Sequence, residues 1–101
     1  MADFNKPVVL NLAQEHTVHG RFFMYKLMIA NQSSQPTAVN FTPLGEVPAE
    51  PFFLVVQGLS TLLVSMPIEF SDGVRIAQLD DKVNLLFVKL PTDPLHKVLP
   101  V

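Results

Sequence analysis

The stretch Arg21–Asn31, which reads RFFMYKLMIAN, decides the fold class of this chain. It is rich in aromatic and aliphatic residues without a helical apolar stripe, and this pattern is typical of a β-strand. Side chains along a strand point alternately to its two faces. Strict alternation therefore predicts one face formed by Phe23, Tyr25, Leu27 and Ile29, expected to point inward, and a second face formed by Phe22, Met24, Lys26 and Met28.

The second face of this strand is unusually apolar for a surface that meets solvent. Phe22, Met24 and Met28 lie on it, and methionine and aromatic side chains are favoured at adaptable contact surfaces. Two explanations remain open: a second sheet covers this face, or another protein molecule covers it. We therefore take these three residues as candidate interface residues.

The residues after this strand continue the β pattern. The polar residues of Asn31–Pro36 are typical of a turn. The β pattern then resumes over Thr37–Thr42, with Val39 and Phe41 expected to point inward. The arrangement Tyr-x-Leu-x-Ile-x-Asn, polar turn, x-Val-x-Phe resembles the paired strands of immunoglobulin-like sandwich domains. The resemblance spans only this part of the chain, and it supports a sandwich architecture.

Prolines and glycines divide the rest of the chain into short apolar runs. The chain has nine prolines and four glycines, and apolar runs bounded by such residues are typical of strands separated by turns. The expected strands are 7–12 (with Val8, Leu10 and Leu12 on one face), 52–56, 59–65 continued by 68–70, and 83–90 (with Val83, Leu85 and Phe87 on one face).

Three segments between these runs need separate interpretation. Gln57-Gly58 separates two runs that do not alternate cleanly, which predicts a tight hairpin between central strands buried on both faces. Val74–Leu79 suits a short helix about as well as a strand, and that choice stays open. Pro43–Pro51 holds three prolines and reads as an exposed loop.

About seven short strands at near-regular spacing predict one all-β domain over residues 1–101. We expect a small antiparallel β-sandwich, immunoglobulin-like or jelly-roll-like. Residues 1–6 and the proline-rich residues 91–101 are expected to form extended N- and C-terminal arms. The C-terminal arm adds further candidate interface residues and could dock on its own domain or on a neighbour; these are Leu95, Val98, Leu99 and Val101.

No catalytic or metal-binding constellation stands out. The chain has no cysteine, which removes thiol chemistry and cysteine-based metal sites. His16 and His19 are three apart in an extended segment and are expected on opposite faces, while Asp80 and Asp81 share a turn and diverge. We therefore expect no catalytic residue, no metal and no cofactor. A small hydrolase-type enzyme remains an alternative, because a triad assembled in space leaves no motif.

Composition favours contact with protein. Hydrophobic residues make up 49% and charged residues 16% of the chain, and a domain of this size cannot hide every apolar side chain in its own core. The net charge of −2, with Lys and Arg scattered singly, argues against nucleic-acid binding. No signal peptide or membrane-spanning run is visible, so we expect synthesis in the cytoplasm, with incorporation into an assembly or virion.

These features predict a non-enzymatic structural or assembly protein. We expect it to self-associate as a homo-oligomer, or to dock onto a larger protein assembly of the virion or fibre type, through apolar sheet surface and terminal arms. A protein- or ligand-binding β-sandwich module is the alternative, with the Pro43–Pro51 loop as its contact.

Overall fold

The computed structural model describes residues 6–45, 50–78 and 80–91, and this part of the chain forms nine β-strands and no helix. The all-β prediction is confirmed, with more strands than the seven expected. The strands are β1 (Lys6–Asn11), β2 (His16–His19), β3 (Phe22–Asn31), β4 (Thr37–Pro43), β5 (Phe52–Val56), β6 (Ser60–Val64), β7 (Ile68–Phe70), β8 (Gly73–Ala77) and β9 (Val83–Leu90).

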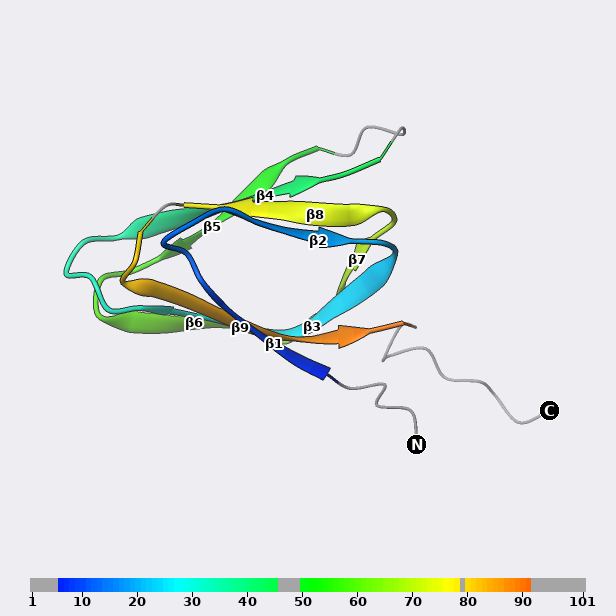
Figure 1. Ribbon diagram of the computed structural model, residues 1–101. Helices are drawn as coiled ribbons and strands as arrows, with labels where there is room; N and C mark the ends of the chain where they lie inside the picture. Colours follow the sequence, from blue (N-terminus) through cyan, green and yellow to red (C-terminus); the bar gives the residue numbers. More distant parts are fainter. Residues whose placement is uncertain (1–5, 46–49, 79, 92–101) are drawn as a thin grey trace.

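The strands form two antiparallel sheets that pack face to face (Figure 1). Sheet A has the order β1-β9-β3-β6, with β7 also paired to β3, and sheet B has the order β2-β8-β4-β5. In Figure 1, sheet B with β2 and β8 lies above sheet A with β1 and β9. The prediction of a small antiparallel β-sandwich is confirmed.

The strand pairs are nested along the chain. β1 pairs with β9, β2 with β8, β3 with β6 and β7, and β4 with β5. The chain is thus one long antiparallel ribbon that folds back between β4 and β5 and rolls up, and the pairs β3–β9 and β4–β8 complete the sheets. This is the connectivity of a jelly roll. It decides between the two sandwich types that the sequence left open.

Two strand pairings suggested by the sequence are wrong. β3 and β4 are not neighbours in one sheet, because the turn between them crosses from sheet A to sheet B. Gln57-Gly58 does not form a hairpin either, because β5 pairs with β4 whereas β6 pairs with β3. The two crossing turns instead lie against each other. Leu59 N–H donates to the Ser33 carbonyl (2.8 Å), and a Cβ at position 58 would collide with the Ser34 carbonyl, which requires glycine there.

A β-bulge in β3 reverses its side-chain alternation. Tyr25 lies opposite Val88 and Met28 lies opposite Leu86, so β3 carries one more residue than the facing segment of β9. Lys26, within the bulge, has a φ of 52°, in the left-handed region. An extra residue on one strand turns every later side chain to the other face.

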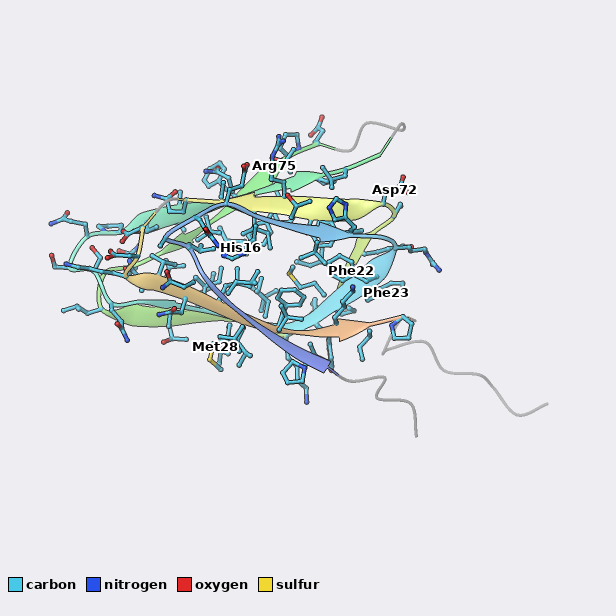
Figure 2. The ribbon with its side chains drawn as sticks, in the orientation of Figure 1. His16, Phe22, Phe23, Met28, Asp72 and Arg75 are labelled. Atoms are coloured by element: carbon cyan, nitrogen blue, oxygen red, sulfur yellow. The ribbon has the colours of Figure 1, made fainter. Side chains whose placement is uncertain are left out.

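The bulge explains why the predicted faces of β3 are wrong before it and right after it. Phe22 and Met24 before the bulge point into the core, with exposed fractions of 1% and 0%, and Leu27 and Ile29 after it are also buried. Only Met28 of the three candidate interface residues on this strand is exposed, at 36%. Figure 2 shows Phe22 between the sheets and Met28 on the outer side of sheet A. The second sheet, and not another molecule, covers Phe22 and Met24.

The core lies between the two sheets and contains phenylalanine rings that pack against one another. The Phe22 and Phe70 rings are 5.4 Å apart between centroids, and the Phe41 and Phe52 rings are 5.0 Å apart. The residues predicted inward on β4, and the residues grouped on one face of the segments 7–12 and 83–90, pack here. Leu12, Val39, Phe41, Val83, Leu85 and Phe87 are fully buried, and Val8 and Leu10 are partly buried against them.

Two remaining predictions can be placed. Residues 74–77 of the ambiguous segment belong to strand β8, in which Val74 and Ile76 alternate into the core between β2 and β4. Lys6, assigned to the N-terminal arm, is the first residue of β1. Residues 1–5 of that arm lie outside the described residues, as do the C-terminal interface candidates Leu95, Val98, Leu99 and Val101.

Candidate protein interface

Large apolar side chains are exposed mainly along one long side of the sandwich. Most of those in the described part of the chain belong to β5, β6 or the segments that adjoin them, with exposed fractions from 47% to 75%. Such a concentration differs from the single scattered apolar residues that any protein surface carries. We call this group the apolar edge: Phe53, Val55, Leu59, Leu63 and Met66.

The alternation of β5 and β6 produces the apolar edge. On β5, Phe52, Leu54 and Val56 point toward the core, so Phe53 and Val55 point to the outer side of sheet B. On β6 the inward residues are likewise apolar, which leaves Leu63 on the outer side of sheet A. Apolar residues on both faces led to the prediction of central strands. That prediction is wrong, because here the outer face is exposed and not covered.

Both strands are edges of their sheets. In the described part of the chain β5 pairs only with β4, and β6 pairs only with β3. An edge strand presents unpaired backbone N–H and C=O groups, and proteins usually protect it with charges, prolines or bulges. The segment Phe52–Met66 contains no charged residue and no proline. Both edges on this side are therefore open to pairing and electrically neutral.

Leu59 occupies an unusual position in the turn between the two strands. Its φ of 54° lies in the left-handed region, which large side chains rarely adopt, and its side chain is 75% exposed. It borders a shallow hollow of about 270 Å³. The other residues that line the hollow are Ala30, Asn31, Gln32, Ser60 and Thr61, and none of them is ionisable.

An apolar row extends from this side across the outer face of sheet A. Leu63 on β6 lies opposite Met28 on β3, Met28 lies opposite Leu86 on β9, and Leu86 lies opposite Val9 on β1. The bulge turns Met28 outward into this row, where Figure 2 shows it projecting from the sheet. One predicted interface residue is therefore part of a continuous exposed surface.

The polar candidates considered for catalysis are not brought together. His16 Nε2 donates a hydrogen bond to the Asn11 carbonyl oxygen, 2.7 Å away, while His19 lies on the opposite, exposed face of β2. Asp80 closes a turn by accepting from the Lys82 N–H at 2.9 Å. Within the described residues, no group of three or more His, Cys, Asp or Glu could hold a metal ion.

Comparison with models of known protein families, with curated proteins and with solved structures gives no match to this chain. Among the described residues, no helix is long and apolar enough to cross a membrane. The sequence did carry a signal for the apolar edge, namely the absence of charge over residues 52–66.

Proposed function

We propose that this chain is a non-enzymatic structural subunit that acts by protein–protein contact through the apolar edge. One observation carries the proposal: two neighbouring edge strands, one from each sheet, are neutral, and they expose Phe53 and Val55 on the outer side of sheet B and Leu63 on the outer side of sheet A. Edge strands of this composition are a recognised hazard of aggregation in a free protein. A partner that covers them removes that hazard.

The size of the hydrophobic effect supports a large contact. Burial of one large apolar side chain contributes about 1.5–3 kcal/mol. Association itself costs an estimated 4–15 kcal/mol or more in lost freedom of motion. A single exposed leucine could not offset that cost, whereas the apolar edge and the adjoining apolar row can act together. We therefore expect the whole side of the sandwich to enter the contact.

The assembly that we propose is a homo-oligomer or a larger array of the virion or fibre type. Jelly rolls are used by viral capsid proteins, among others, which makes the fold compatible with such a role. Fold alone does not carry function, so the support for assembly comes from the surface. The terminal arms would add contacts outside the described residues.

Light scattering coupled to size-exclusion chromatography tests the proposal. We expect the wild-type chain to form an oligomer at micromolar concentration, and the double variant Phe53→Lys/Leu63→Lys to be monomeric, because it places one charge on each open edge. Both positions are exposed, so the fold should persist, as circular dichroism would show.

The matched control is Gln14→Lys/Thr17→Lys, which adds the same charge at exposed positions on the opposite side. It should leave the oligomer intact. A wild-type chain that stays monomeric over the whole concentration range, or a double variant that assembles like the wild type, would refute the proposed function.

A further inference from the structure

We infer that the partner of the apolar edge is a second copy of this chain, paired antiparallel along β5 about a two-fold axis at Leu54. Sheet B would then continue from one copy into the other. This inference rests on the proposed function and names the partner and the register of that same surface.

The open backbone of β5 calls for an extended partner. Among the described residues, β5 is hydrogen-bonded to β4 along one side only, from Phe52 to Val56. Its other side presents backbone donors and acceptors that an added strand can satisfy. The strand is preceded by the exposed residues Glu50 and Pro51 and followed by Gln57, so the neutral part that can pair is the strand itself.

The sequence of β5 is complementary to itself in the antiparallel direction. A two-fold axis at Leu54 places each Phe53 opposite Val55 of the partner subunit, and each Phe52 opposite Val56 of the partner subunit. Aromatic and β-branched residues form favourable cross-strand pairs. The pair Phe53–Val55 lies on the outer face, where both residues are exposed in a single copy. Leu54 meets its own counterpart on the inner face and extends the core.

Neutrality also favours a second copy. A two-fold contact brings identical surfaces together, so any charge at its centre meets a like charge. Phe52–Met66 carries none. Two copies can therefore approach along β5 without repulsion between their edges.

Other edges in the described part of the chain fit self-pairing less well. A two-fold axis at Leu62 on β6 would place Thr61 opposite Leu63 of the partner subunit, a polar residue against an apolar one. The same edge is broken at Ser65–Pro67, beyond which β7 carries the ion pair between Glu69 and Arg21 (3.0 Å). Across the sandwich, β1 begins with Lys6 and Pro7, and β2 has two histidines among its four residues.

Single-cysteine cross-linking tests the register, because the chain has no cysteine of its own. Residues directly opposite in an antiparallel pair have Cα atoms about 4.5–5.5 Å apart, within the range of about 4.4–6.8 Å that disulfides span. We expect Leu54→Cys to form a disulfide-linked dimer under mild oxidation. In the Phe53→Cys single variant, the two cysteines would lie two residues apart along the paired strands, beyond disulfide reach. This variant should therefore link at least tenfold more slowly.

The double variant Phe53→Cys/Val55→Cys provides an independent readout on the outer face. In the dimer, the cysteine at position 53 of each copy would lie opposite the cysteine at position 55 of the other copy, so two disulfides can form. We expect fast linking of this variant, and this result does not depend on whether a cysteine at position 54 disturbs the core. Leu63→Cys on β6 is the control and should link slowly. Non-reducing electrophoresis measures all four rates.

The outcomes separate this inference from the proposed function. If the wild type is oligomeric but Leu63→Cys links faster than Leu54→Cys and the double variant, assembly stands and pairing through β5 is refuted. If Phe53→Cys alone links as fast as the double variant, the register is wrong and the inference fails in the same way. A wild-type chain that is monomeric at every concentration would refute both the proposed function and this inference.

Discussion

Strands β1 and β2 form one long side of the sandwich, and strands β5 and β6 form the other, and the two pairs of strands differ in polarity. The first pair has Lys6, Pro7 and Glu15 on or beside its strands, together with the polar residues His16 and His19. The second side has no charged residue from Phe52 to Met66. In the described part of the chain, backbone pairing ends at both sides alike, so side-chain chemistry is what would distinguish an edge that repels partners from one that accepts them.

The two sides also differ in how their crossing turns are held. Asn11 ends β1 and accepts from the Ala13 N–H (3.0 Å), and Asn31 ends β3 and accepts from the Ser33 N–H (2.9 Å). Both asparagines therefore make the same local turn. Asn11 is exposed, whereas Asn31 is 2% exposed and sits beside the connection between β5 and β6. The burial of Asn31 makes the neutral side the more tightly fixed one.

Replacement of Asn31 should have the largest effect on stability. Its side-chain amide donates to the carbonyls of Gln35 (2.8 Å), Val56 (3.2 Å) and Gln57 (3.3 Å). Asn31→Ala leaves buried backbone groups without partners, which should cost about 2–4 kcal/mol of unfolding free energy. Urea unfolding followed by circular dichroism measures the loss.

Asn11→Ala is the matched control for that experiment. Its amide donates to the Asp81 carbonyl (3.0 Å) and to Asn84 Oδ1 (2.9 Å) at an exposed site, where water can replace the lost partner. We expect a cost of about 0.5–1 kcal/mol. Equal losses in the two variants would contradict the difference between the two sides.

A lysine placed on one or the other edge strand of sheet B should show which of the two edges takes part in assembly. Val55 and Thr17 are both β-branched, exposed and on edge strands, β5 and β2 respectively. Val55→Lys should raise the dissociation constant of the oligomer at least tenfold, a change of about 1.4 kcal/mol, and Thr17→Lys should leave it unchanged. Sedimentation velocity over a dilution series distinguishes the two; a shift of equal size in both would mean that net charge, and not the β5 edge, controls assembly.

Leu59 offers a smaller gain in stability. Leu59→Asn keeps the left-handed backbone with a residue that tolerates it, and removes an exposed apolar side chain. We expect stabilisation by about 0.5–1 kcal/mol, seen as a rise of a few degrees in Tm. Leu63→Asn, at an exposed position in an ordinary strand, is the control and should show no rise. A fall in Tm for both would show that Leu59 is not strained.

The ion pair on the charged side should contribute least. Arg75 Nε lies 3.2 Å from Glu15 Oε1, and both side chains are about half exposed. Exposed pairs of this kind contribute about 0–1 kcal/mol and weaken with salt. Glu15→Gln should therefore change the unfolding free energy by less than about 0.5 kcal/mol. A larger, salt-independent loss would mean that charge on this side also holds the sandwich together.

Periodicity predicted the sandwich because most strands keep a strict two-residue alternation. Val39 and Phe41 on β4 are buried as expected, and Leu85 and Phe87 share the buried face of β9. The prediction failed for the residues of β3 before the bulge, because no residue type in the sequence signals the bulge at Lys26. It failed again on β5 and β6, because an apolar outer face looks the same in sequence whether a sheet or solvent covers it.

Residue types alone therefore determined the β class of this chain, its turn positions and the neutrality of residues 52–66, since these depend on local propensity and charge. Tertiary structure decided which strands became edges, which residues of β3 entered the core, and that Phe53 and Leu63 meet solvent on the outer faces of the two sheets. The physical reason is that pairing between distant strands is chosen by the packing of the whole sandwich, and no short stretch of sequence encodes it.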